Sequence, residues 1–414
     1  MFHTNKPNGF YTGSIDLWDL PGRLVYVGLS EEYKKNFLAA LKNLSHRKNW
    51  SSLAELIEEK LDALTPFVIR NTKISLHLLA KLSDLLVNNG FDQFTKNEIE
   101  KHIVRIGAQK NSKEITNPKI PFNFANGDGM IFISAIMHDG GIMGSTSQPF
   151  YVNFDISMRK YVNDAAQNVF GKINSKAIDI KNTQITFPKI IGILLIHGIG
   201  LEKGDKTIRD IEIPEFVKAA NANLKCKYLQ QAFDDEGCVG VKRKTISFKS
   251  AALYNKQSAL IQIVQKMLED IEISSKIKKD CDYISKGKKK TCWVLHIHGK
   301  NNLEVFSNNI NFKITKKRQK LYTILTSYKQ EHNKLWKQVL LTGLKKIQEE
   351  KRDFNYKDIK NLMNKSYNRT SDYIDWLVSQ GIIIKIKDRT HDGPCFVPCV
   401  YTFSQKYKDQ IHFQ

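Results

Sequence analysis

The sequence predicts an α+β protein that carries two copies of one αββα-type unit, and two observations lead to this prediction. Residues 1–116 show apolar side chains at helical spacing, whereas residues 117–321 alternate helical segments with strand-like runs. Within the second region, an apolar helical segment that ends in an acid and a Gly occurs twice, at residues 132–141 and 228–238. Residues 322–414 form a third region with its own order of helices and strands. A chain of 414 residues is long enough for two or three such domains.

The charge balance indicates a polyanionic partner. The chain has 64 Lys and Arg against 42 Asp and Glu, a formal net charge of +22, which favours nucleic acid ahead of a membrane surface. We find no lipidation motif, and the longest apolar run, residues 190–201, is shorter than the ~20 residues that span a bilayer. The alternative is a surface that is merely charged and soluble.

Cysteine usage and the N-terminus indicate the compartment. Six scattered Cys and an N-terminus without an apolar signal core argue against a secreted, disulfide-bonded protein. The sequence has no CxxC pair that would suggest a zinc module. We therefore expect a reduced, cytoplasmic protein.

Residues 1–116 are expected to be helical. Segments 30–43, 51–61 and 75–86 have helical spacing of apolar residues, and the last two open on a Ser that can cap the first turn. The short basic connection TPFVIRNTK lies between the last two segments. This order fits a helix-turn-helix unit and equally a plain helical bundle.

The two acid-Gly motifs begin repeats of matching order. Residues 132–142 can be laid over 229–239, which aligns Asp139 with Glu236 at a separation of 236 − 139 = 97 residues. Each motif precedes a strand-like stretch and then an amphipathic helix. The strands are expected at 150–157, 239–248 and 291–297, and the helices at 161–170 and 259–271. Two copies of one unit in a chain suggest a pseudo-two-fold arrangement.

Asp139 and Glu236 come to one end of the molecule if the two motif helices pack side by side along the pseudo-two-fold axis. Carboxylates at the C-terminal end of a helix face the negative end of its dipole. A divalent cation with hard oxygen ligands removes this conflict, and the pattern fits Mg²⁺. Two such sites near an axis could cut both strands of a duplex. Taken singly, each acid can equally be a solvated residue before a Gly that ends the helix.

Residues 322–414 show the order of a winged helix. A helix at 356–363, a second helix at 369–379 that ends at Gly381, and two strands joined by a turn follow one another, and the basic segment 313–320 connects them to the repeats. The residues expected to form the core are Ile359, Leu362, Ile374, Leu377 and Val378, and those expected to face bases or phosphates are Asn368, Arg369, Ser371 and Asp372. The alternative is a winged helix that contacts proteins.

The segments FISAIMHDGG and YLQQAFDDEG resemble the two motifs of LAGLIDADG homing endonucleases of the single-chain, two-motif kind. The segments NPKIPF, FPKIIGILLIHGIGL and WVLHIHGKNNLEVFSNNINF support the resemblance, which covers about residues 117–321. It implies two αββαββα repeats whose saddle-shaped antiparallel sheets lie over DNA and read its major groove. We expect a free-standing protein, because the chain begins with Met and ends IHFQ and so lacks the self-splicing residues of an intein.

The resemblance implies an active site. Asp139 and Glu236 become metal-binding catalytic acids, with Gly140 and Gly237 beside them in the metal site, and Mg²⁺ becomes the cofactor. In this family a basic residue near the end of a repeat often assists the attacking water. The candidates for this role are Lys313, Lys316 and Lys317.

The motifs also depart from the family pattern. The second motif has Gln230 and Gln231 where the family often has Gly or Ala at the helix crossing, so a wider crossing and a shifted second acid are expected. The first motif keeps small residues at this place. His138, directly before the first acid, is a ligand or a surface neighbour.

The leading hypothesis is a site-specific, Mg²⁺-dependent double-strand DNA endonuclease that acts as a monomer with internal pseudo-two-fold symmetry. The DNA contacts of its strand stretch would come from Lys242, Arg243, Lys244 and Lys249. One alternative is a non-cleaving, sequence-specific transcriptional regulator, similar to the sporulation-type regulators that join a degenerate LAGLIDADG domain to a helix-turn-helix. The other alternative is RNA binding, as in intron maturases.

Overall fold

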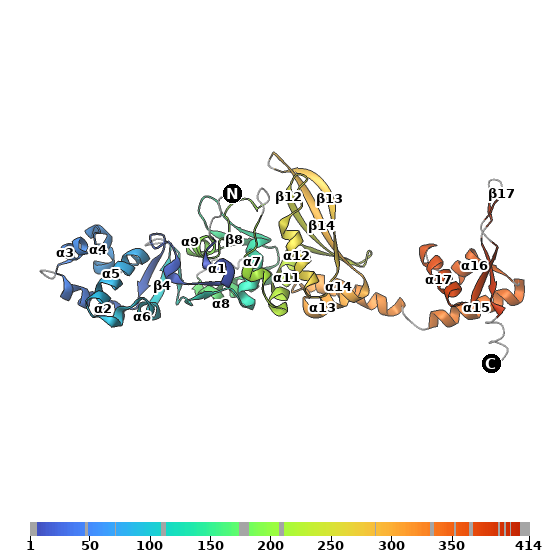
Figure 1. Ribbon diagram of the computed structural model, residues 1–414, viewed down its shortest axis with the longest axis horizontal. Helices are drawn as coiled ribbons and strands as arrows, with labels where there is room; N and C mark the ends of the chain where they lie inside the picture. The colour runs from blue at the N-terminus through green and yellow to red at the C-terminus, as the bar shows by residue number, and fades with distance from the viewer. Residues whose placement is uncertain are drawn as a thin grey trace. The chain divides into compact units, whose positions relative to one another are not determined.

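The computed structural model describes residues 6–405, apart from 46–48, 71, 109–112, 174–181, 207–210, 286, 332–334, 352, 364–366, 388–389, 393–394 and 398. The described residues contain both helices and antiparallel sheets, which confirms the α+β class (Figure 1). The chain divides into two compact units, Met1–Leu325 and Thr326–Gln414. The boundary lies inside α14 (Thr315–Glu331), so most of the expected connection at 313–320 is helical. Lys, Arg and Gln are good helix formers, which explains the helix in this basic segment.

The N-terminal part of the first unit combines helices with a sheet, so the expectation of a helical region is wrong in part. The helices are α2 (Glu31–Leu44), α3 (Trp50–Leu56), α4 (Leu61–Ile69), α5 (Leu76–Asn88) and α6 (Lys96–Lys101), and α4 takes in half of the connection TPFVIRNTK. The antiparallel sheet has the order β3-β2-β4-β5-β9, with β2 (Tyr26–Leu29), β3 (Ile74–Ser75), β4 (Ile103–Gly107), β5 (Glu114–Thr116) and β9 (Lys172–Ile173). Strands this short show too little alternation of apolar and polar side chains to be recognised in a sequence.

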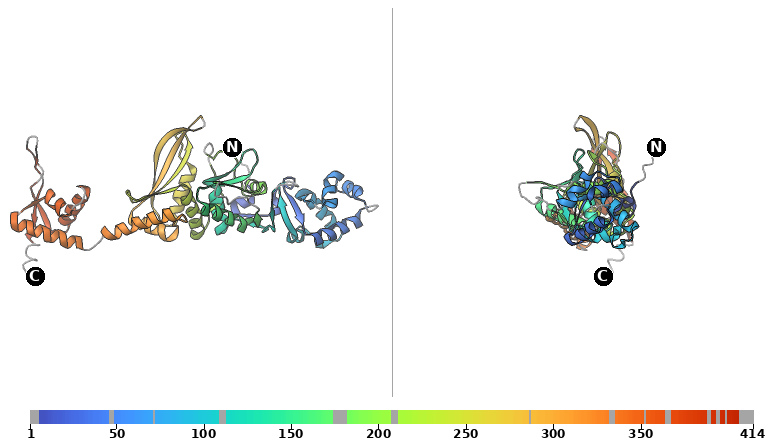
Figure 2. Two further views of the ribbon diagram at one scale, coloured as in Figure 1. Left: turned by 180° about the vertical axis from the view of Figure 1, so that it is seen from behind. Right: turned by 90° about the vertical axis from the view of Figure 1, so that its left-hand side faces the viewer.

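Two similar repeats follow, both within the first compact unit. The first contains α7 (Gly127–Met137), β7 (Gly140–Ile142), β8 (Pro149–Val152), α8 (Ile156–Phe170), β10 (Gln184–Thr186) and α9 (Lys189–Ile193). The second contains α11 (Ala222–Glu236), β11 (Gly237–Gly240), β12 (Thr245–Leu253), α12 (Ala259–Glu269), β13 (Ser275–Ser285), β14 (Lys288–His298) and α13 (Lys300–Asn309). The sheets have the orders β10-β8-β7 and β13-β14-β12-β11, so three strands pair in the same sequence in both. The β13–β14 hairpin projects well beyond the helices of its repeat (Figure 2).

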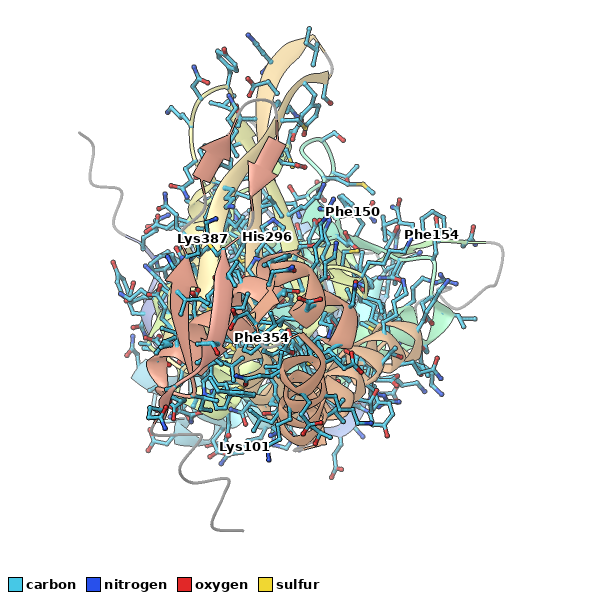
Figure 3. The ribbon with its side chains drawn as sticks, turned by 90° about the vertical axis from the view of Figure 1, so that its right-hand side faces the viewer. Lys101, Phe150, Phe154, His296, Phe354 and Lys387 are labelled. Carbon is cyan, nitrogen blue, oxygen red and sulfur yellow. The ribbon has the colours of Figure 1, made fainter. Side chains whose placement is uncertain are left out.

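The strand expected at 150–157 is shorter in the structure. β8 ends at Val152, because the carboxylate of Asp155 accepts a hydrogen bond from the backbone N–H of Ser157 at 2.8 Å and thereby caps α8. Phe154, which continued the alternation of the sequence, is 90% exposed and points outward in Figure 3.

Helices α7 and α11 pack side by side in the centre of the first unit (Figure 1). Every residue of α7 from Gly129 to Met137 is buried. At the crossing, the hydroxyl of Ser134 donates a hydrogen bond to the backbone carbonyl of Tyr228 at 2.8 Å, and both residues are fully buried. This contact shows that the small residues of the first motif let the two backbones approach closely.

Leu in place of Ser134 is expected to lower the free energy of unfolding by about 1–3 kcal/mol, because a larger side chain at a close-packed crossing forces the helices apart. Ser134→Ala is the matched control and should cost only about 1 kcal/mol, the net value of the lost hydrogen bond. Urea unfolding measures both. Equal stability of the two variants would show that the crossing has spare space.

The second unit contains a helix, a strand, two helices, and then a strand, a hairpin and a final strand. These are α15 (Leu335–Lys351), β15 (Phe354–Asn355), α16 (Tyr356–Met363), α17 (Tyr367–Ser379), β16 (Ile383–Lys387), β17 (Thr390–Asp392), β18 (Cys395–Val397) and β19 (Val400–Phe403), with the sheet order β15-β19-β16. Ile359, Ile374 and Leu377 are buried in its core as expected, and Leu362 is partly buried. Val378 is 43% exposed, so its place in the core is corrected. The winged-helix assignment stays a prediction.

Candidate active site

The structure brings Asp139 and Glu236 together at one end of the paired motif helices. Glu236 is the last residue of α11, and Asp139 follows the end of α7 by two residues. The two carboxyl groups interact electrostatically: the charge of Asp139 raises the pKa of Glu236. The convergence that the sequence pattern suggested is therefore present in the fold.

Burial sets the electrostatics of this pair. Burial raises the pKa of Glu236 to about 7, with Asp139 as a further cause. It also raises the pKa of the Asp139 carboxyl, which the ammonium groups of Lys206 and Lys317 lower again in part. Two neighbouring carboxylates in a poorly solvated place hold protons more tightly unless positive charge compensates them.

Two lysines supply part of that positive charge, one at the end of each motif helix. The ammonium of Lys206 donates to the carbonyls of Ile136 (3.2 Å) and Met137 (3.0 Å) and also to that of His138. The ammonium of Lys317 donates to the carbonyls of Phe233 (3.1 Å) and Asp234 (2.5 Å). Cations at the last carbonyls of a helix interact favourably with the negative end of its dipole. A lysine stabilises the end of the motif helix in this way in both repeats.

Lys206 was not among the sequence candidates, and two of the three candidates lie elsewhere. Burial lowers the pKa of Lys206 to about 8. Lys317 occupies the equivalent position in the second repeat, whereas the ammonium of Lys313 lies 4.6 Å from the ring centre of Tyr161. Lys316 is exposed and is not among the charges that shift the two acids. A search for a basic residue near the end of the first repeat, as well as the second, could have found Lys206.

Two further acids at the end of α11 accept hydrogen bonds from other segments of the chain. The carboxylate of Asp234 accepts hydrogen bonds from the backbone N–H groups of Lys313 (2.7 Å) and Ile314 (3.1 Å), just before α14. The carboxylate of Asp235 accepts a hydrogen bond from the hydroxyl of Tyr151 at 2.7 Å. Burial raises the pKa of Asp234 to about 6 and that of Asp235 well above its ordinary value. Neither acid was singled out by the sequence.

The glutamines of the second motif are both held by hydrogen bonds. Gln230 donates to the carbonyl of Ile310 at 2.7 Å. The amide of Gln231 donates to the Asp235 carboxylate at 2.9 and 3.0 Å. The fully buried Gln231 amide also donates to the hydroxyl of Tyr151 in the first repeat at 3.1 Å, so this side chain links the two repeats. The wider crossing stays a prediction.

His138 is a buried residue, so its interpretation as a surface neighbour is corrected. It is 5% exposed, and its ring makes edge contacts with the rings of Tyr228 and Phe248. Neither ring nitrogen has a hydrogen-bond partner among the described residues. Burial lowers the pKa of His138 to about 3, so the imidazole is neutral.

A cavity of about 230 Å³ opens beside the acids. Its lining includes His138, Lys206, Glu236, Lys249 and Cys292. The side chains of Lys206 and Lys249 therefore line the same cavity as the carboxylate of Glu236.

The donor set fits Mg²⁺ better than a softer or more demanding metal. Among the described residues, no group of three or more His, Cys, Asp or Glu side chains is arranged to hold a metal ion. Mg²⁺ needs no such group, because it commonly uses one or two carboxylates together with water and substrate phosphates. Asp139 and Glu236 supply two carboxylates, and the backbone at Gly140 and Gly237 lies next to them.

The predicted DNA contacts of the second repeat lie on or beside one open sheet. Lys242 and Arg243 are exposed and Lys244 is half-buried in the turn from β11 to β12. Lys249 is exposed on β12 and pairs with Asp280 at 2.7 Å.

The open face of the same sheet carries cationic and imidazole groups that the sequence analysis did not name. The strand register places His296 beside Ser247 of β12 and Lys276 of β13, and His298 beside Thr245 (Figure 3). Directly paired residues share one face of a sheet, so the face opposite the apolar core is rich in donors.

The candidates of the second unit lie in α17. Ser371 is half-buried there. Asn368 and Arg369 belong to the same helix, and their side chains lie outside the described part of the structure.

Glu236→Gln is expected to stabilise the metal-free protein at high pH. The folded pKa of Glu236, about 7, exceeds its ordinary value of 4.5. A raised folded pKa adds stability that is fully present below pH ~4.5 and is lost as the pH rises through ~7. The variant should therefore exceed the wild type by on the order of 2–3 kcal/mol at pH 8 and match it near pH 4.5. Urea unfolding in EDTA tests this, and a difference that does not vary with pH would contradict the assigned environment.

Comparison with known proteins identifies one family. A model of the LAGLIDADG-like domain matches residues 223–311, which run from α11 to the end of α13 and include Glu236. The second repeat is therefore similar to a LAGLIDADG-like domain, in agreement with the resemblance of the second motif. The crystal structure of the N-terminal LAGLIDADG domain of DUF199/WhiA is similar over 50% of this chain and 90% of that chain, with 14% sequence identity and a TM-score of 0.29. No curated protein matches the chain.

The helices in the described part of the chain are each too short or too polar to cross a membrane.

Proposed function

We propose that the chain is a site-specific, Mg²⁺-dependent double-strand DNA endonuclease of the LAGLIDADG homing type. One observation carries the proposal: two half-buried acids, one from each repeat, meet at the ends of adjacent helices, and a half-buried lysine caps each helix end. Because both acids belong to one chain, a monomer with internal pseudo-two-fold symmetry is sufficient. Duplex DNA as the partner agrees with the net charge of +22 and the cationic open sheet.

Each residue of the site has a defined role in this proposal. When bound, Mg²⁺ would supply Lewis-acid stabilisation of the scissile phosphate and acidify a water molecule. Asp139 and Glu236 would hold the ion through their carboxylates. Lys206 and Lys317 lower the pKa of both acids and so favour the ionised carboxylates that a metal needs. Lys249, at the cavity, would contact a phosphate oxygen.

A non-cleaving, sequence-specific transcriptional regulator is the second candidate. A specific observation favours it: burial raises the pKa of Glu236 to about 7, so without a metal this acid is partly protonated in neutral solution. The second unit would then act as a winged-helix DNA-binding domain with α17 in the major groove. This candidate predicts specific binding with no change when the acids are replaced.

A selection from a random duplex library distinguishes the two functions. The wild-type protein is incubated with the library in Mg²⁺ or in EDTA, and both bound duplexes and newly formed ends are sequenced. A nuclease enriches one sequence in EDTA and cuts that sequence at fixed positions in Mg²⁺. Enrichment in both conditions without cleavage supports the regulator. A chain that enriches no sequence contradicts both candidates.

A further inference from the structure

A basic groove of about 500 Å³ lies between the N-terminal sheet and the first repeat. One wall comes from the turn before β2 and the end of β4, and the other from α9 and the helical turn that follows it. The lining residues are Arg23, Leu24, Tyr26, Ala108, Ser147, Lys189, Ile193, Ile196, His197 and Lys203. None of these is acidic.

The cations of the groove come from separate segments of the chain. Arg23 is exposed in the turn before β2, Lys189 is half-buried at the start of α9, and His197 is exposed. In the part of the chain that the structure describes, Arg23 and Lys189 make no ion pair, so their charge is available. Burial and the nearby ammonium of Lys203 lower the pKa of His197, as expected in a positive environment.

The walls of the groove are fixed to one another by backbone contacts. β5 of the N-terminal sheet pairs with β9, which directly follows α8 of the first repeat, through Ile115–Ile173 and Thr116–Lys172. At Gly192 of α9, an added Cβ atom would lie 1.7 Å from the carbonyl oxygen of Ser147. This helix is therefore pressed onto the loop between β7 and β8, and only Gly allows the approach.

The backbone that presents His197 is unusual. Residues Leu194–Gly198 form a π-helical turn directly after α9. Such turns are rare in proteins and occur frequently at functional sites, where they redirect a side chain. Here the turn leaves the imidazole of His197 exposed in the groove, while Leu194 and Leu195 stay buried.

We propose that this groove binds the phosphodiester backbone of the duplex, outside the segment covered by the two repeats. The inference rests on the proposed DNA binding and assigns the N-terminal region a share in it. Cations in a groove whose lining has no acid suit phosphates that approach from solvent, and the exposed Arg23 can form a two-pronged contact with one of them. Phosphate contacts fix register without reading bases, so the groove would lengthen the footprint and leave the recognised sequence unchanged.

The test compares two double variants with equal loss of charge. Arg23→Ala/Lys189→Ala removes two groove cations, and Lys35→Ala/Lys60→Ala removes two exposed lysines of the same region, one in α2 and one just before α4. Binding to a duplex selected by the wild-type protein is measured as a function of salt. The groove variant should lower the salt slope by about 2, one for each lost phosphate contact, and the control should leave it nearly unchanged.

Modified DNA provides a second measurement, in which the charge is removed from the DNA instead of the protein. Neutral methylphosphonates are placed in the flank on either side of the selected site. On one flank they should weaken wild-type binding, and they should have no further effect on the Arg23→Ala/Lys189→Ala protein. Equal salt slopes for the two double variants, or no flank effect, would overturn the groove assignment while DNA binding itself stands. Failure of the wild-type protein to bind any duplex would instead overturn the proposed function.

Discussion

Replacing Asp139 by Asn or Glu236 by Gln is expected to reduce Mg²⁺-dependent DNA cleavage by about 10²–10³-fold or more, while binding of the target duplex persists. Each acid lies at the end of one motif helix, and each is placed to hold the metal through one carboxylate. Replacement by an amide keeps the shape of the side chain and removes the charge that the metal needs. Strand-specific cleavage rates on a selected duplex, with the two strands labelled separately, measure the effect.

Asp164→Asn is the matched control for these variants. Asp164 is an exposed acid on α8 and is not among the charges that shift the pKa of the paired carboxyls, so its loss removes the same charge and should leave cleavage unchanged. Loss of nicking on only one strand, in only one of the two acid variants, would mean that the acids serve separate strands. Undiminished cleavage in both variants would contradict the assignment.

Lys317→Met should reduce cleavage about 10²-fold, whereas Lys316→Met should have little effect, although the two lysines are neighbours in the sequence. The ammonium of Lys317 caps α11 and lowers the pKa of both catalytic candidates. Lys316 is exposed. Without Lys317 the carboxyls hold protons more tightly, so the rise of activity with pH should move to higher pH as well.

Lys206→Met tests the equivalent position in the first repeat. It leaves the carbonyls at the end of α7 without their donor, which should cost about 1–3 kcal/mol of unfolding free energy in addition to the loss of rate. Rate–pH profiles and urea unfolding of both Met variants separate the two effects. A lower rate with an unchanged pH profile would mean that the lysines serve the fold alone.

The sequence identified the motif helices and their final acids because their pattern is long and periodic. The apolar spacing of α7 and α11 extends over three turns, and both motifs place an acid directly before Gly. A pattern of this length can be recognised in a single sequence. The LAGLIDADG-like match over residues 223–311 agrees with the second motif. The strands of the N-terminal sheet are shorter and follow no such period, so they were missed.

The sequence could not choose the lysine of the second repeat, and it missed that of the first. Successive residues of a helix point about 100° apart, so within α14 only Lys317, and not Lys316, can reach the end of α11. Lys206 lies in a segment without regular structure, where no period indicates its direction. The hydrogen bond of Gln230 depends on Ile310, 80 residues away in the chain, which no local pattern reveals.

In the proposed function, Asp139 and Glu236 form one metal-dependent centre that cuts DNA. The most direct measurement is cleavage of a selected duplex by the wild-type protein in Mg²⁺, in Ca²⁺ and in EDTA, with binding followed in parallel. We expect the protein to bind in all three conditions and to cleave at fixed positions in Mg²⁺ alone. Tight, specific binding without cleavage of that duplex in Mg²⁺ would contradict it.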